Sequence, residues 1–130
     1  MCEAEHSVLI ETLTDLSFEA FGDVIEVQPQ PNEVINQGNC NRYTDLARLE
    51  FAGGGRAGIS LFQARPCAVP LTLLYVERHP LGNQAFLPMT GDPFLIVVAE
   101  DNDGKPARPK GFVTMPGQGV NYHRGFGMGC

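Results

Sequence analysis

The stretch Val76-Glu77-Arg78-His79-Pro80-Leu81-Gly82-Asn83-Gln84 joins two apolar runs and is itself rich in polar side chains. Glu77 and His79 are two residues apart, so in an extended strand both side chains point to the same side. Pro80 disfavours helical backbone at His79, which supports an extended conformation there. The stretch therefore predicts β-structure with Glu77 and His79 side by side. The simpler alternative is that these groups are solvated charges at the edge of a sheet.

Short apolar runs of about 4 to 8 residues, the length of β-strands, lie on both sides of this stretch. Gly, Pro, Asn and Asp separate the runs, which is typical of turns. We predict strands near residues 8–13, 23–27, 46–51, 58–63, 71–77, 84–88, 94–99 and 111–115. Only residues 17–21, with Ser17 as the N-cap and Gly22 after the end, predict a short helix. This pattern of many short strands predicts an all-β sandwich or barrel.

A second polar segment, Pro116-Gly117-Gln118-Gly119-Val120-Asn121-Tyr122-His123-Arg124, contains glycines that allow close backbone approach. Taken alone, it is typical of a turn with exposed polar side chains. Together the two segments supply carboxylate, amide and imidazole groups, which suit a divalent metal such as nickel, manganese or iron(II). The proposed ligand set is Glu77, His79, Gln84 and His123.

The composition indicates one globular domain. The chain has 130 residues, 43% hydrophobic and 18% charged, so we expect a single domain over residues 1–130 with a leader at 1–7 and a divergent tail at 125–130. The formal net charge of −6 disfavours nucleic acid as a partner. No apolar run reaches the ~20 residues that a membrane helix needs, so no membrane partner is expected. The acidic N-terminus and four widely spaced cysteines, typical of free thiols, predict a cytoplasmic location.

The spacing Glu77-x-His79-x4-Gln84-x6-Gly91 fits the first cupin motif, and residues 116–123 resemble a variant of the second. Four longer blocks resemble the ureidoglycolate lyases, also called ureidoglycolate hydrolases, and occur in family order. The blocks are Ile35-Asn36-x-Gly38, Arg42-Tyr43-x-Asp45-Leu46-Ala47, Glu77-Arg78-His79-Pro80-Leu81-Gly82-x-Gln84-Ala85-Phe86-x-Pro88-Met89 and Gln118-Gly119-Val120-Asn121-Tyr122-His123-Arg124. The third block is long and highly specific.

This resemblance implies a homodimer with a cupin-type double-stranded β-helix, or jelly-roll barrel. It also implies a lyase that splits (S)-ureidoglycolate into glyoxylate and urea in allantoin and purine degradation. Family members are expected to continue past Arg124 with further strands, whereas this chain reads Gly125-Phe126-Gly127-Met128-Gly129-Cys130. We therefore expect a barrel that is incomplete at its C-terminal end and a truncated chain of lower activity. The glycine-rich tail should be poor strand material.

The implied reaction needs a base, an acid and a cation, because a hydroxyl proton is removed, a urea nitrogen is protonated and a carboxylate is held. His79 and His123 suit the proton transfers, while Glu77 suits the orientation of a histidine or the binding of metal. Nickel or manganese would polarise a substrate oxygen. The expected substrate-binding residues are Arg42, Arg78 and Arg124 for the carboxylate and Asn36, Asn121 and Tyr122 for the ureido group.

Two other functional classes remain open on the sequence alone. The first is a cupin that binds a small ligand without catalysing a reaction. The second is a truncated product without activity, because open sheet edges and an exposed core favour aggregation. Solution behaviour separates them, since an inert folded dimer fits the first class and an insoluble chain fits the second.

Overall fold

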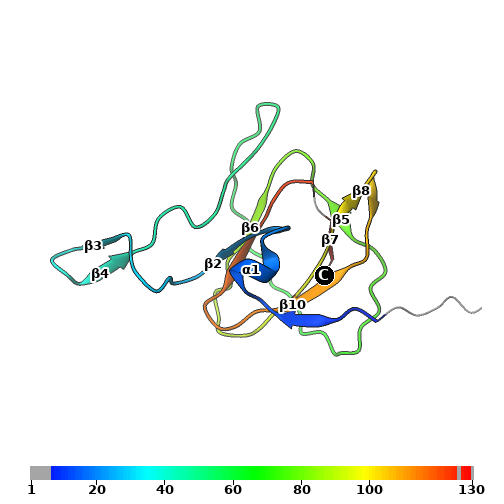
Figure 1. Cartoon of the computed structure of the whole chain (residues 1–130), viewed down its shortest axis with the longest axis horizontal. Coiled ribbons are helices and arrows are strands. Elements are labelled where there is room, and N and C mark those ends of the chain that lie inside the picture. The colour runs from blue at the N-terminus through cyan, green and yellow to red at the C-terminus, as the bar shows by residue number, and fades with distance from the viewer. Residues whose placement is uncertain (1–6, 126, 130) are drawn as a thin grey trace, which may run out of the picture.

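A computed structural model describes residues 7–125 and 127–129 of the chain. Two larger sheets dominate it (Figure 1). The first has five strands in the order β1 (Ile10–Thr12), β10 (Lys110–Val113), β7 (Leu95–Ala99), β12 (Gly127–Gly129) and β5 (Glu77–Arg78). The second has three strands in the order β2 (Gly22–Ile25), β11 (Gly119–Tyr122) and β6 (Gln84–Phe86). The prediction of an all-β fold is confirmed, and the architecture is consistent with a cupin-type β fold.

Two hairpins and one short helix complete the described elements. The hairpins are β3 (Glu33–Ile35) with β4 (Cys40–Arg42), and β8 (Asp101–Asn102) with β9 (Lys105–Pro106). The β3–β4 hairpin projects from the body of the molecule, and all of its strand residues are exposed (Figure 1). Helix α1 spans Asp15–Phe18 and precedes β2.

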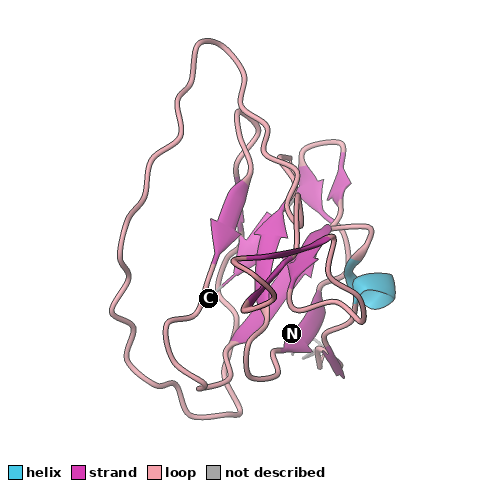
Figure 2. Cartoon of the chain, turned by 90° about the vertical axis from the view of Figure 1, so that its left-hand side faces the viewer, coloured by secondary structure: helices cyan, strands magenta, loops and turns pink. Residues whose placement is uncertain are grey.

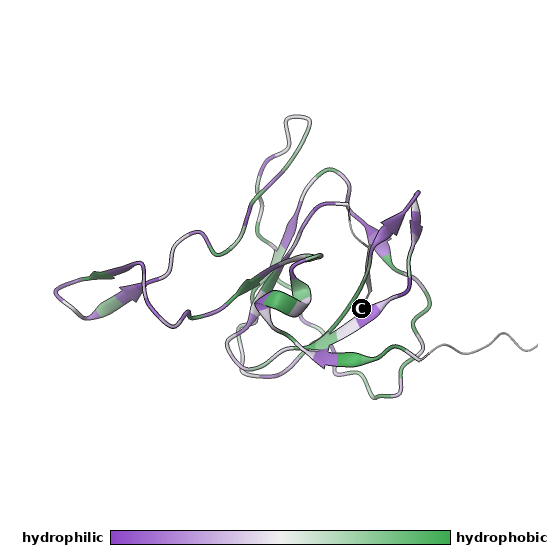
Figure 3. Ribbon diagram, in the orientation of Figure 1, coloured by the Kyte–Doolittle hydropathy of each residue, from purple (hydrophilic) through white to green (hydrophobic). Residues whose placement is uncertain are grey.

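The hydrophobic core lies between the two larger sheets. Aromatic rings from α1 and the turn after it meet the five-stranded sheet, since Phe18 and Phe112 pack edge to face with ring centres 5.4 Å apart. Val24 and Val120 enter the core from the three-stranded sheet and are 3% and 0% exposed. Green, hydrophobic ribbon marks these inner segments in Figure 3. Aromatic burial of this kind is a major stabilising contribution in a small domain.

Five predicted strands are confirmed in place, since β1, β2, β6, β7 and β10 each overlap a predicted range. The predictions at 46–51 and 58–63 are wrong, and the strand predicted at 71–77 is reduced to its last residue, Glu77, which begins β5. Figure 2 shows long irregular segments outside the sheets. Ile59 is 100% exposed and Leu61 83%. An apolar alternation forms a strand only where a neighbouring backbone supplies hydrogen bonds, and no described strand pairs with 58–63.

Three corrections concern local signals. The helix begins earlier than predicted because Thr14, and not Ser17, is its N-cap; Ser17 closes a capping box with it through reciprocal 3.1 Å bonds. The segment interpreted as an exposed turn contains β11, which is buried and paired on both sides. The tail expected to be poor strand material contains β12, which pairs with β7 and β5.

Some predictions fall on residues outside the described part. The predicted leader is described only at Ser7, and Cys2, Phe126 and Cys130 lie outside the described residues as well. Within the described ranges, no helix combines the length and the hydropathy needed to span a membrane.

Candidate functional site

A set of polar side chains centred on one buried amide, Asn121, lies on the outer face of the three-stranded sheet. Strand β11 alternates, so Val120 and Tyr122 face the core while Asn121 faces away from it. The register places Asn121 opposite Asp23 on β2. Asn121 is nevertheless 0% exposed, because the chain around Arg48 crosses this face and bonds to it.

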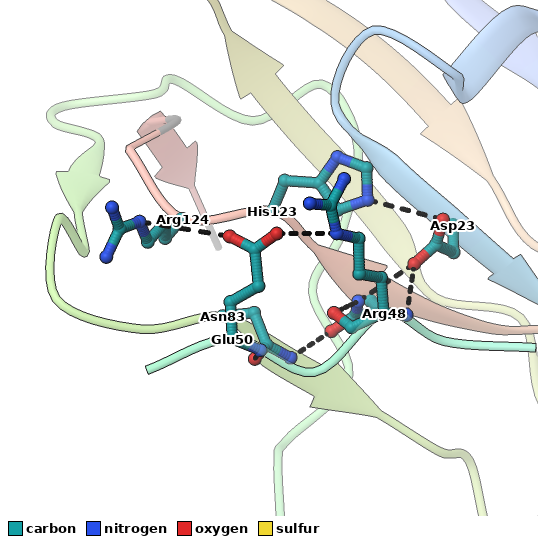
Figure 4. A network of polar contacts seen from close by, with 7 residues as sticks. Asp23, Arg48, Glu50, Asn83, His123 and Arg124 are labelled. Carbon is teal, nitrogen blue, oxygen red and sulfur yellow. Dashed lines mark hydrogen bonds and ion pairs between the residues drawn. The ribbon is translucent and has the colours of Figure 1, made fainter. Parts of the chain in front are cut away.

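Figure 4 shows the resulting polar network, which we define as Asp23, Arg48, Glu50, Asn83, Asn121, His123 and Arg124. Asn121 is its centre. Its Nδ2 donates to Asp23 Oδ2 at 3.0 Å and to the Arg48 carbonyl oxygen at 2.9 Å, and its Oδ1 accepts a hydrogen bond from Asn83 Nδ2. Asn83 in turn accepts a 2.5 Å bond from the backbone N–H of Glu50. The covering segment is thus fixed to the sheet by the side chains of Asn121 and Asn83.

The carboxylate of Asp23 is held by donors from two directions. Its Oδ2 accepts the Asn121 amide and also the backbone N–H of Arg48 at 2.8 Å. Burial by itself raises the pKa of Asp23, but the hydrogen bonds from Arg48 and Asn121, together with the neighbouring His123, outweigh it and lower the pKa below its ordinary value. Asp23 therefore stays ionised at neutral pH.

His123 presents its imidazole to this carboxylate. Its Nε2 lies 3.2 Å from Asp23 Oδ1. Nε2 is shielded from solvent and makes no hydrogen bond, so its contact with Asp23 Oδ1 is electrostatic. The backbone N–H of His123 donates to Phe21 O at 3.0 Å, which fixes the start of the side chain.

Two arginines converge on Glu50 at the solvent side of the network (Figure 4). Arg48 Nε lies 2.6 Å from Glu50 Oε1, and Arg124 Nε lies 3.9 Å from Glu50 Oε2. All three side chains are at least partly exposed. Glu50 thus holds two guanidinium groups near each other, and each guanidinium has five N–H donors, more than its contact with Glu50 uses.

Comparison with known proteins decides the family. The ureidoglycolate lyase family model matches residues 5–127. This chain belongs to the ureidoglycolate lyase family. A ureidoglycolate lyase of Rhodobacter capsulatus is 56% identical over 117 residues, which cover 90% of this chain and 73% of that protein. Ureidoglycolate lyase 2 of Rhizobium meliloti is 53% identical over 113 residues, which cover 86% of this chain and 69% of that protein. A ureidoglycolate lyase of a Chelativorans species is 48% identical over 118 residues, which cover 90% of this chain and 72% of that protein.

Of the residues that the family resemblance implied, the structure brings three into the network: Asn121, His123 and Arg124. Tyr122 lies elsewhere, because its ring packs in the core 5.5 Å from that of Phe86. Asn36 and Arg42 lie on the projecting hairpin, where Arg42 pairs with Glu33 at 3.2 Å.

Arg78 is engaged at the other sheet. It binds Asp101 at 2.8 Å, and this hydrogen bond, with one from the backbone of Gly104, lowers the pKa of Asp101. Arg78 therefore does not face the polar network in this structure.

The metal set expected for a cupin is not assembled. His79 follows β5 and lies 3.5 Å from Glu77, whereas His123 follows β11 and faces Asp23. Gln84 pairs with Tyr122 and so lies on the opposite face of the sheet from Asn121 and Asp23. In the described ranges no three His, Cys, Asp or Glu side chains are grouped so that they could hold a metal ion. The four residues do not fit a bound nickel or manganese ion here.

The two histidines also line different hollows. The first, of about 230 Å³, is formed by residues 79–84. The second, of about 370 Å³, lies beside Asp23 and His123 and is rimmed by the acids Asp15, Glu19 and Asp45. A backbone hydrogen bond from Gly125 N to His79 O at 3.0 Å nevertheless joins the two segments that carry these histidines, and a pocket shared by both stays a prediction.

Four members of the network were not predicted from the sequence: Asp23, Arg48, Glu50 and Asn83. Asn83 stands inside the specific block from Glu77 to Met89, and Arg48 directly follows the block that ends at Ala47. That adjacency was a usable signal. Asp23 and Glu50 carried none, because only strand register and chain crossing bring them to Asn121.

Proposed function

We propose that this chain is a ureidoglycolate lyase, which cleaves (S)-ureidoglycolate into glyoxylate and urea during allantoin and purine catabolism. The observation that carries the proposal is the family match over residues 5–127. The polar network supports it, because it joins an imidazole, an ionised carboxylate and two guanidinium groups on one face of a sheet. These are the groups that the reaction requires.

The chemistry is an elimination from a carbinolamide. A base takes the proton of the hydroxyl group, the C–N bond breaks, and the oxygen electrons form the aldehyde of glyoxylate. The electron pair of the broken bond goes to the urea nitrogen, which receives a proton. We assign both proton transfers to His123, because an imidazole can accept a proton at one nitrogen and return it from the same atom.

We assign the substrate carboxylate to Arg48 and Arg124, since a guanidinium binds a carboxylate through paired coplanar donors. Asn121 supports the site from behind, because its amide hydrogens already bond Asp23 and Arg48. His79 lines the other hollow, with Glu77 3.5 Å from its imidazole, and the catalytic roles expected for these two residues stay predictions. No step is assigned to nickel or manganese, because the four expected ligands are not brought together.

We also propose that the protein is a cytoplasmic homodimer. The β3–β4 hairpin is a two-stranded unit exposed on every strand residue, including Val34 at 56% and Ile35 at 37%. An isolated hairpin is at best marginally stable in water, so a second copy that covers it would stabilise it.

The cytoplasmic location is supported by the cysteines, because the exposed thiols of Cys40 and Cys67 favour a reducing compartment.

The experiment is incubation of the purified chain with (S)-ureidoglycolate. Glyoxylate is measured as its phenylhydrazone, and urea as the ammonia released when urease is added. We expect equal amounts of glyoxylate and urea, with no ammonia before urease is added. Ammonia without urease would overturn the lyase assignment in favour of hydrolysis. Saturable binding without turnover, measured by calorimetry, would support a small-ligand-binding cupin instead.

A further inference from the structure

Asp23 has no assigned role, yet it is the most highly connected carboxylate of the network. It sits on β2, directly across the sheet from Asn121, and its side chain is 28% exposed. Its Oδ2 is occupied by two donors, the Arg48 backbone at 2.8 Å and the Asn121 amide at 3.0 Å. Its Oδ1 is left facing His123 Nε2 at 3.2 Å.

We propose that Asp23 is a positioning residue that fixes the ring orientation and tautomer of His123. The inference rests on the proposed lyase function. An ionised carboxylate has no proton to donate, and its negative charge 3.2 Å away favours an N–H over a lone pair on the imidazole nitrogen that faces it. Nε2 is therefore N–H, and the lone pair of the neutral ring resides on Nδ1, the nitrogen that points away from Asp23 (Figure 4).

This arrangement gives each ring nitrogen one task. Nδ1 accepts the hydroxyl proton of the substrate and returns it to the departing urea nitrogen, while Nε2–H remains against Asp23. The imidazolium formed between these transfers lies beside a negative charge, which stabilises it. A carboxylate that holds a catalytic histidine in this way contributes strongly to turnover without touching the substrate.

The support behind Asp23 explains how the orientation is maintained. Asn121 is 0% exposed and bonded at both ends of its amide. The Arg48 segment is tied to the sheet by Arg48 N, by Arg48 O and, through Glu50 N, by Asn83. The carboxylate thus has little freedom to turn away from His123. Such locked supporting shells are what hold a catalytic group in productive geometry.

The test compares Asp23→Asn with the control Glu19→Gln, which removes one negative charge from the exposed rim of the same hollow. Asp23→Asn should lower kcat by about 10²-fold and change KM by less than about twofold, because the substrate is still bound. Glu19→Gln should leave both constants within about twofold of the wild type. In a His123→Ala background, Asp23→Asn should cause no further loss, because it acts through that ring.

A spectroscopic measurement keeps this proposal separate from the lyase assignment. The ¹⁵N shifts of the His123 ring at pH 8 should show Nε2–H in the wild-type protein and loss of that preference in Asp23→Asn. Nδ1–H in the wild type would overturn the proposal, and this needs no variant to fold. An equal loss of rate from Asp23→Asn with and without His123 would overturn it too. Absence of urea release with Nε2–H present would refute the lyase assignment alone.

Discussion

Asn121 shows how much one side chain contributes to this molecule. It is a fully buried amide on the outer face of a sheet, which is tolerated only because every polar atom has a partner. Those partners belong to β2, to the segment around Arg48 and to the loop before β6. The amide therefore joins three parts of the chain that are distant in sequence.

Replacement of Asn121 by Ala should lower the free energy of unfolding by about 1 to 3 kcal/mol, because the Arg48 carbonyl and the Asn83 amide lose their partner. The pKa of Asp23 should rise, since one of the bonds that lowers it is removed. Urea denaturation and carboxyl NMR titration measure the two effects. Asn41→Ala, on the exposed strand β4, is the matched control and should change neither quantity. Equal destabilisation by both variants would contradict this role.

The lowered pKa of Asp23 predicts that the stability of the protein depends on pH. Its pKa is lowered in the folded protein, so the stabilisation is complete above the ordinary value near 3.8 and is lost as the pH falls through the folded pKa. The wild type should exceed Asp23→Asn in unfolding free energy at pH 7, and this difference should shrink below about pH 4. Chemical denaturation of both proteins from pH 7 to pH 3 measures it. A difference that stays constant over this range would refute the linkage.

The pairing of β2 with β11 is the contact between elements on which the site depends. It brings Asp23 opposite Asn121 and, through the residue after β11, places His123 beside Asp23. Gly22 allows the close approach, because a Cβ built there would lie 1.9 Å from the Asn121 carbonyl oxygen. No larger residue fits without separating the strands.

Gly22→Ala should therefore destabilise the protein by about 1 to 3 kcal/mol, the usual cost of forcing an extra group into a packed site. Activity should fall with it, because Asp23 and His123 lie on the displaced strands. Gly58→Ala is the control, since a Cβ at that glycine meets no atom within 4 Å. Thermal melting and urea release are the measurements. A stable and fully active Gly22→Ala protein would mean that this register is not needed.

The two substrate-binding residues expected on the β3–β4 hairpin raise a question about the assembled protein. Arg42 pairs with Glu33 on the same hairpin, which projects away from the body (Figure 1). In the proposed homodimer, Arg42 would fulfil its expected role at the site of the second copy, beside the Arg48 and Arg124 of that copy. In a symmetric dimer the same exchange would occur twice.

Mixing two defective proteins tests this exchange. Arg42→Ala and His123→Ala should each be nearly inactive at low substrate concentration, and subunit exchange between them should restore about one quarter of wild-type activity. The recovery arises because each mixed dimer holds one complete site if the hairpin acts across the interface. A mixture of Asn41→Ala with His123→Ala is the control, because it shows how far an inactive partner dilutes the activity of a protein with an intact site. Absence of recovery, with mixed dimers shown by native mass spectrometry, would place Arg42 in its own chain's site or in none.

Local patterns sufficed for the all-β class and for five strand positions, because alternation and turn residues act over a few residues. They failed at 58–63, where an apolar alternation has no neighbouring strand among the described elements. They failed in the opposite sense at β12, where glycines are held in a sheet by partners on both sides. Strand formation in both cases was decided by neighbours rather than by propensity.

Some residues of the candidate site could also be predicted from the sequence, and others became apparent only in the folded structure. His123, Asn121 and Arg124 could be selected from the sequence because a specific family block contains them. Their partners Asp23 and Glu50 became visible only when β2 was registered against β11 and the Arg48 segment crossed the sheet. Sequence order records which side chains are present and which face of a strand each one takes. Hydrogen-bond register and chain crossing, which join residues up to about a hundred positions apart, decide which of them meet.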